Sequence, residues 1–280
     1  MRITLLLAIL LLSAHEAFAQ LAPANPTGVA MGHLHYRVKD VSANVAFWES
    51  LGGKPVRVGP SQQAVRFQDV FVFLTQGEYS GTSEGAVVNH IAFRVPSFAA
   101  LEKAGIKVQR LAGFPGVGNT NTPEGERVEL FEDAALNLTF TPDDGKHAAG
   151  SDRHNRTVGV PIAFHHVHLY LPGEEHLAAK AWYVRMFGGI GGKRSNYDAV
   201  DLPGINLNFS GGRPSAAMTG RTLEHIGFEV AGLEAFSKRL ASMGVKFEAP
   251  YRKNTDGIAT ATVVDPWGTL IELTEGLRGR

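Results

Sequence analysis

A histidine pattern that occurs twice is the part of this sequence best suited to chemistry. Residues 32–35 (GHLH) and 165–168 (HHVH) each lie in a short apolar run with the alternation of a β-strand. A further strand-like histidine follows each copy: His90 lies 57 positions after His33, and His225 lies 59 after His166. Because neutral imidazole is the commonest metal ligand in proteins, the pattern indicates a duplicated chain, with a repeat of 133 to 135 residues, that presents metal ligands on strands.

The second copy ends with a carboxylate. Residues 265–272 (DPWGTLIE) place Glu272 between Ile271 and Leu273, in an otherwise apolar strand where an unpaired charge would be costly. Two histidines and one carboxylate form the ligand set of open, chemically active divalent metal sites. We therefore expect a metal site made of His166, His225 and Glu272. The alternative is that Glu272 faces solvent at a sheet edge.

The first half lacks an obvious counterpart of this carboxylate. A shift of 133 residues places Thr139 opposite Glu272. Glu129 or Glu132 would replace it only if the neighbouring strand turned inward, and such a change of register is disfavoured because it moves every side chain to the other face. The histidines of this half are thus expected to form only a weak or degenerate site: His33, His35 and His90.

Four similar units follow one another along the chain. Each opens with a histidine-bearing strand, continues with a helix and returns as two or three strands; the opening strands are expected at 34–38, 90–95, 167–171 and 225–230. The helices are expected at 42–51, 97–104, 174–187 and 233–243, each closed by a glycine suited to a left-handed cap: Gly52, Gly105, Gly188 and Gly244. Since one unit cannot cover both faces of its sheet, units should pair. We expect an N-terminal domain at 28–142, a linker at 143–160 and a C-terminal domain at 161–276.

Composition and the first residues limit the cellular compartment and the binding partners that are expected. Arg2, the apolar run 3–12 and the small-residue motif at 17–19 predict a signal peptide over residues 1–19 and an exported protein, periplasmic or extracellular, without a membrane segment after cleavage. There is no cysteine, so disulfides cannot stabilise the fold. The formal net charge is +0, with 27 basic and 27 acidic side chains and no basic block, which argues against nucleic acid as a partner.

These motifs resemble the vicinal oxygen chelate superfamily, which includes glyoxalase I, bleomycin-resistance proteins and extradiol dioxygenases. The matching features are the strand histidines, the segment 182–188 (WYVRMFG) with its echo at 47–52 (FWESLG), and the terminal DPWG with Glu272. The resemblance implies an α+β fold of four βαβββ modules forming two paired-module domains, whose sheets curve around a cavity with metal ligands on their inner faces. It also implies a degenerate first domain, as in two-domain extradiol dioxygenases.

Several further residues are candidates for substrate contacts. His168, one pleat from His166, is a candidate catalytic acid or base because imidazole titrates near neutrality; it could equally be a packed structural histidine. Asn206 and Asn208 occupy the strand on which glyoxalase-type relatives place a carboxylate ligand. Because an asparagine replaces that carboxylate, a metal site with four protein ligands is not expected here, and Asn208 is a candidate substrate contact. Tyr251 and Arg252 could hold an anionic substrate or simply form a solvated turn.

The resulting hypothesis is an enzyme in which a divalent metal (Fe, Mn, Zn or Ni) chelates vicinal oxygens of a small substrate. Its reaction would be that of a dioxygenase or of a glyoxalase-type lyase or isomerase, and a homodimer is one assembly open to it. The alternative is a non-catalytic protein that sequesters a small molecule, as bleomycin-resistance proteins do. A purely structural exported scaffold would explain the fold but not the register of the histidines.

Overall fold

The computed structural model describes residues 21–132, 139–145, 162–212 and 216–280. The predicted signal peptide and nearly all of the predicted linker lie outside these ranges. In the described residues the chain forms four modules, each a strand, a helix and then three strands, as the α+β prediction expects. Among these residues no helix is both long and apolar enough to span a membrane.

The first two modules have the following elements. Module 1 contains β1 (Val29–Val38), α1 (Val41–Ser50), β2 (Lys54–Val58), β3 (Gln62–Phe67) and β4 (Val70–Gln76). Module 2 contains β5 (Val88–Val95), α2 (Phe98–Lys103), β6 (Gln109–Arg110), β7 (Val117–Asn121) and β8 (Arg127–Glu132), and the short strand β9 (Phe140–Pro142) follows it.

The second half repeats the order. Module 3 contains β10 (Ala163–Tyr170), α3 (Glu175–Phe187), β11 (Ile190–Arg194), β12 (Tyr197–Leu202) and β13 (Ile205–Ser210). Module 4 contains β14 (Leu223–Val230), α4 (Leu233–Ser242), β15 (Lys246–Lys253), β16 (Ala259–Val264) and β17 (Leu270–Glu275). The glycine after each helix has a positive φ, between 68° and 97°, as predicted from its position.

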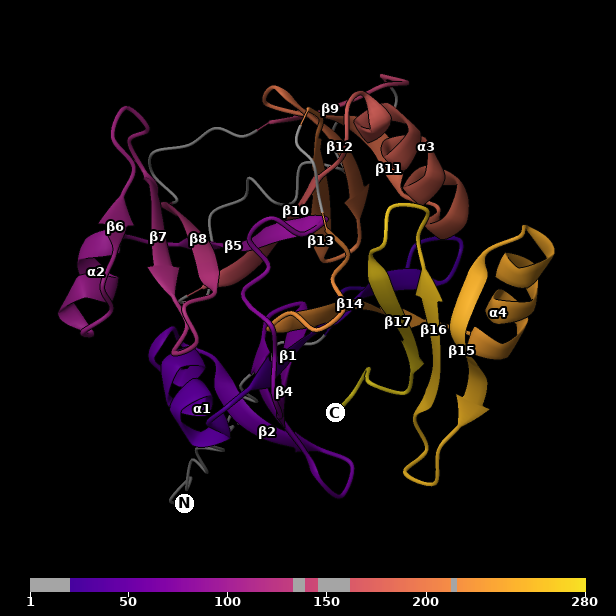
Figure 1. Cartoon of the computed structure of the whole chain (residues 1–280), viewed down its shortest axis with the longest axis horizontal. Coiled ribbons are helices and arrows are strands. Elements are labelled where there is room, and N and C mark those ends of the chain that lie inside the picture. The colour runs from indigo at the N-terminus through magenta and orange to yellow at the C-terminus, as the bar shows by residue number, and fades with distance from the viewer. Residues whose placement is uncertain (1–20, 133–138, 146–161, 213–215) are drawn as a thin grey trace, which may run out of the picture.

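The modules pair across the two halves of the chain. Sheet A has the order β15-β16-β17-β14-β1-β4-β3-β2 and therefore joins modules 1 and 4, while sheet B has the order β6-β7-β8-β5-β10-β13-β12-β11-β9 and joins modules 2 and 3. Figure 1 shows modules 2 and 3 along the top and modules 1 and 4 below them. The pairing of neighbouring modules that the expected domains imply, 1 with 2 and 3 with 4, is therefore not the pairing that forms the sheets. Each sheet is joined at its middle by an antiparallel pair of opening strands, β1 with β14 and β10 with β5.

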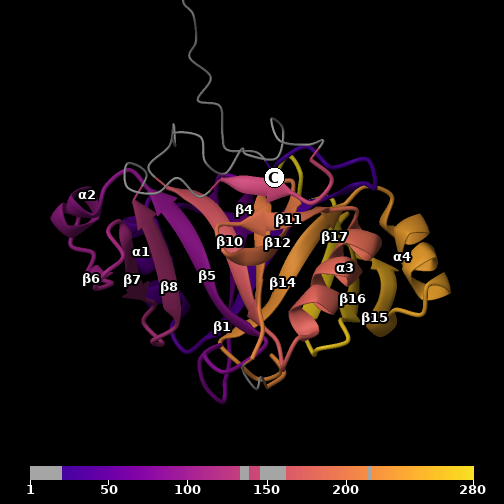
Figure 2. The ribbon, with the colours of Figure 1, turned by 90° about the horizontal axis from the view of Figure 1, so that it is seen from above.

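The two sheets share one apolar core. After the bulge in each strand, alternation directs Leu34 and Tyr36 of β1 and Val167 and Leu169 of β10 to this core. The intervening side chains, His33 and His35 of β1 and His166 and His168 of β10, lie on the opposite faces. Aromatic rings from different modules pack against one another in this core. The ring centroids of Phe67 in sheet A and Phe93 in sheet B lie 5.0 Å apart, and those of Phe187 in α3 and Phe228 in sheet A lie 4.9 Å apart. Figure 2 shows α1 and α2 at one end of the molecule and α3 and α4 at the other. The histidine faces of both sheets are therefore left for the functional sites.

The DPWG segment is a turn, anchored by the buried Asp265, that fixes the start of β17. The Asp265 carboxylate accepts hydrogen bonds from the backbone N–H groups of Trp267 (3.0 Å) and Thr269 (2.7 Å) and from the Tyr183 hydroxyl (2.9 Å). Asp265 is 3% exposed. The turn thereby joins α3 to the strand that carries Glu272.

Replacing Asp265 should weaken the fold measurably. Asp265→Ala leaves three donors without their acceptor and is expected to lower the free energy of unfolding by about 2 kcal/mol, measured by urea denaturation. Asp40→Ala is the matched control, because the exposed Asp40 carboxylate accepts from Ala43 N at the start of α1; its loss should cost about 1 kcal/mol. Equal losses of unfolding free energy in the two variants would contradict the role of Asp265 as the acceptor of three hydrogen bonds.

Candidate metal centres

Sheet A holds a two-histidine, one-carboxylate cluster, named site A: His33 on β1, His225 on β14 and Glu272 on β17. The Glu272 Oε2 atom lies 3.0 Å from His33 Nε2 and 3.4 Å from His225 Nε2. His33 is fully buried, and Glu272 keeps about a fifth of its side chain exposed. One carboxylate oxygen and two imidazole nitrogens therefore converge at a point that solvent can still reach.

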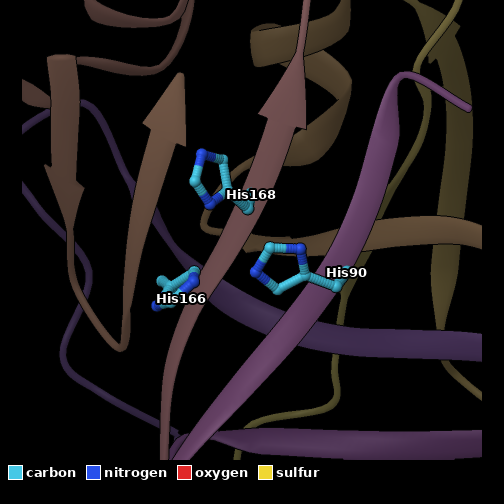
Figure 3. Close-up of side chains that lie close together, drawn as sticks. All are labelled: His90, His166 and His168. Atoms are coloured by element: carbon cyan, nitrogen blue, oxygen red, sulfur yellow. The ribbon is translucent and has the colours of Figure 1, made fainter. Parts of the chain in front are cut away.

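Sheet B holds a second cluster of the same composition, named site B: His90 on β5, His166 on β10 and Glu129 on β8. The Glu129 Oε2 atom lies 3.3 Å from His90 Nε2 and 3.5 Å from His166 Nε2. His168 belongs to the same group, since ligand atoms of His90, His166 and His168 lie within 4.8 Å of one another. Figure 3 shows these three side chains on the adjacent strands β5 and β10.

Strand register makes the two sites equivalent. In sheet A, His35 pairs with His225 and His33 with Gly227; in sheet B, His168 pairs with His90 and His166 with Ala92. The carboxylates occupy matching places too, because Glu272 lies beside Gly227 and Glu129 lies beside Ala92. Each site thus takes one histidine from each paired module and its glutamate from the last strand of one of them.

A fourth position distinguishes the sites. The residue beside His35 in sheet A is Phe73, and the residue beside His168 in sheet B is Asn208. Phe73 stacks on His33 with ring centroids 4.6 Å apart, so site A has an apolar wall where site B has an amide. Asn208 accepts a hydrogen bond from the Asn206 side chain.

The nitrogens of both sites are suited to hold a cation. His33, His90, His166 and His225 each have a buried Nε2 atom with no hydrogen-bond partner among the described residues. These atoms lie near a carboxylate oxygen without hydrogen-bond geometry, so they point at a shared position rather than at each other. Buried polar atoms without partners are rare in folded proteins, and a bound ion is one arrangement that satisfies them. The residues present therefore fit a divalent metal.

Burial favours the protonation states that metal ligation requires. It lowers the pKa of His33 and His90, and it lowers that of His166 well below the ordinary value, with further lowering by the neighbouring His165, His90 and His168. Burial raises the pKa of Glu272, but the nearby His225 and His33 side chains outweigh it, so that the pKa of this carboxyl falls well below its ordinary value. Neutral imidazoles and an ionised carboxylate are the ligand forms of divalent metals.

The predicted trio of His166, His225 and Glu272 does not form. His225 and Glu272 lie together in sheet A, but their histidine partner is His33, whereas His166 lies in sheet B with His90 and Glu129. The reason is the crossed pairing of modules, which brings module 1 rather than module 3 beside module 4. His33 and His90 accordingly do not form one degenerate site, because each contributes to a complete site in a different sheet.

Glu129 is the site residue that a constant repeat length misses. It lies 143 positions before Glu272, whereas the histidines repeat at 133 to 135, so a constant shift selects Thr139, which precedes β9 and contributes to neither site. The inward-facing alternative for Glu129 is the arrangement found. Glu132 instead accepts from Phe98 N at the start of α2. Aligning strand to strand, rather than by constant shift, would have found Glu129.

The remaining candidates divide between site and periphery. His168 Nε2 lies 2.8 Å from Ser210 Oγ, and the equivalent His35 Nε2 lies 2.7 Å from Thr75 Oγ1. Both rings thus flank a site and are held by a hydroxyl. Tyr251 and Arg252 lie on β15 at the edge of sheet A, where Arg252 Nε donates to Thr260 Oγ1 at 3.1 Å. Strand β16 separates β15 from β17, which carries Glu272, and no contact of this pair with either site is found in the described residues.

Comparison with known proteins agrees with this architecture. Solved structures with a similar fold include two point mutants of glyoxalase I from Zea mays, both 16% identical to this chain: one covers 89% of this chain and 94% of its own (TM-score 0.59), the other 88% and 92% (TM-score 0.58). A protein from Bacillus subtilis named as a candidate dioxygenase is 17% identical, with 92% and 86% covered and a TM-score of 0.59. No curated protein matches the sequence significantly. The profile of the Glyoxalase/Bleomycin resistance protein/Dioxygenase superfamily matches residues 133–273, just over half of the chain, and the protein belongs to that superfamily.

Proposed function

We propose that the protein is an exported metal-dependent enzyme that binds a small oxygenated substrate through two of its oxygens. The observation that carries this proposal is the repeated geometry of the two sites, in each of which one carboxylate oxygen lies 3.0 to 3.5 Å from two buried imidazole nitrogens. Three protein ligands leave coordination positions for substrate and water. The reaction would be a dioxygenation or a glyoxalase-type lyase or isomerase step.

In site A, His33, His225 and Glu272 would hold the metal, and in site B, His90, His166 and Glu129 would do so. A divalent metal at either site would act as a Lewis acid that stabilises negative charge on substrate oxygens. The protein's own groups orient the substrate and handle protons. His168, which shares a hydrogen bond with Ser210 beside site B, would take or return a proton at its imidazole. Its counterpart in sheet A is the half-buried His35, whose ring centroid lies 5.9 Å from that of Phe73.

Removal of metal should abolish activity reversibly. The protein purified with metal is to be assayed for dioxygen consumption with catechols and for isomerisation of the hemithioacetal of methylglyoxal, before and after chelation. We expect one of these activities, its loss on chelation and its return with one of Fe²⁺, Mn²⁺, Zn²⁺ or Ni²⁺. Ligand binding that survives chelation, without turnover of either substrate, would instead favour the sequestration protein.

The compartment is part of the same proposal. A signal sequence over residues 1–19 would deliver the mature chain to the periplasm or the medium, and comparing the N-terminal residue of the secreted and the intracellular forms tests it. The balanced charge supports a small molecule rather than nucleic acid as the partner. Size-exclusion chromatography with light scattering distinguishes a homodimer from a monomer.

A further inference from the structure

The two sites differ in charge although their ligands match. The position two residues before the glutamate ligand is Arg127 in site B and Leu270 in site A. At the last position of β11 sheet B has Arg194, whereas the equivalent residue of β2 in sheet A is Val58. Asn208 corresponds to Phe73 in the same comparison. Sheet B therefore carries two guanidinium groups at positions where sheet A has apolar side chains.

Arg127 is held close to a metal ligand. One of its terminal nitrogens lies 2.5 Å from Asn89 Oδ1 and 2.5 Å from His90 Nδ1, and His90 Nδ1 lies 3.0 Å from the same Asn89 oxygen. Guanidinium nitrogens only donate, so Arg127 donates to Asn89 Oδ1, and it also donates to His90 Nδ1 in the tautomer that carries its proton on Nε2.

This guanidinium retains hydrogen-bonding capacity. The buried Nε atom of Arg127 has no hydrogen-bond partner among the described residues. A buried donor without an acceptor is costly, and a cation beside a metal adds like charge that an anion would offset. Arg194, at the end of β11 in the same sheet, is almost fully buried. In sheet A, by contrast, Arg37 near the site is paired with Glu224.

Aromatic rings border the same site. His168 stacks on Tyr170 with ring centroids 4.8 Å apart, and Tyr197 meets His168 edge-on at 4.8 Å. Tyr197 is among the exposed large side chains of the described residues. The equivalent of Tyr170 in sheet A is Arg37. A flat substrate in site B could therefore lie against the tyrosine rings, whereas the aromatic ring beside site A is that of Phe73.

We infer that site B binds a substrate bearing a carboxylate beside its two metal-chelating oxygens, and that Arg127 donates to this carboxylate. The inference rests on the proposed metal-dependent function. Site A, whose corresponding residues are Leu270, Val58 and Phe73, does not recognise the anion. The two sites thus differ in the class of molecule that they accept.

A pair of matched ligands tests this selectivity. Catechol and 3,4-dihydroxybenzoate share the same vicinal oxygens and differ by one carboxylate, and zinc loading prevents redox turnover. Isothermal titration calorimetry of the zinc-loaded protein should show 3,4-dihydroxybenzoate binding about tenfold or more tightly than catechol, as one charge-assisted hydrogen bond provides. Arg127→Gln should remove this preference while catechol still binds, and Arg127→Lys should restore part of it.

Leu270→Gln is the control, since it changes the equivalent position of site A and should leave the preference intact. Zinc content is measured in every variant, which separates the two proposals. Equal affinities in the zinc-loaded wild type, a preference that persists in Arg127→Gln, or failure of 3,4-dihydroxybenzoate to bind would overturn the inference alone. A wild-type protein that holds no zinc would refute the proposed function as well.

Discussion

The purified protein should bind two divalent metal ions per chain, and His166→Ala and His225→Ala should each remove one of them. The reason is that the two histidines belong to different sites, His166 with Glu129 in sheet B and His225 with Glu272 in sheet A. Each variant removes one of three protein ligands and leaves the other site untouched. The double variant should hold no metal after dialysis.

This stoichiometry discriminates between the two arrangements of the histidines. If His166 and His225 shared one ion, either single variant would lose all bound metal. The double variant would then have the same metal content as each single variant. Inductively coupled plasma analysis of the dialysed proteins measures the ratio directly. His176→Ala is the control, because His176 lies on α3 and belongs to neither site. Its Nε2 atom lies 3.6 Å from Asp198 Oδ2. A wild-type ratio of one ion per chain would contradict the equivalence of the sites.

Gly227→Ala should disable site A and leave site B intact. A Cβ atom at Gly227 would lie 2.1 Å from Cε1 and 2.4 Å from Nε2 of His33, far inside contact distance. The His33 ring is fully buried against Phe73 and cannot move away without opening the sheet. We expect the loss of one metal ion per chain and a decrease of about 3 kcal/mol in the free energy of unfolding, the upper range for an overpacked core.

The equivalent position of sheet B supplies the comparison. Ala92 stands beside Glu129 as Gly227 stands beside Glu272, so a methyl group is already accommodated there. Ala92→Gly should keep both metal ions and change stability by only about 1 kcal/mol, the usual cost of glycine in a strand or helix. Urea unfolding together with metal analysis measures both effects. Retention of two ions and of wild-type stability in Gly227→Ala would show that His33 is not confined as described.

The sequence by itself determined the modules and most of the residues of the two candidate metal sites. Alternation with a period of two placed the histidines on strands, glycines with left-handed backbone ended the helices, and the costly Glu272 in an apolar strand marked a candidate ligand. These signals depend on residues near one another in the chain, so they are readable without the fold. The α+β class and the superfamily follow from the same repeated pattern.

Which of these side chains lie together was decided only by the tertiary structure. The pairing of β1 with β14 joins residues almost 200 positions apart, and no local pattern specifies which of several similar opening strands a strand will face. The connections also differ in length between the halves, so that Glu129 and Glu272 are separated by more residues than the histidines are. Backbone hydrogen bonding between the opening strands, rather than order along the chain, therefore fixed His33 with Glu272 and His166 with Glu129.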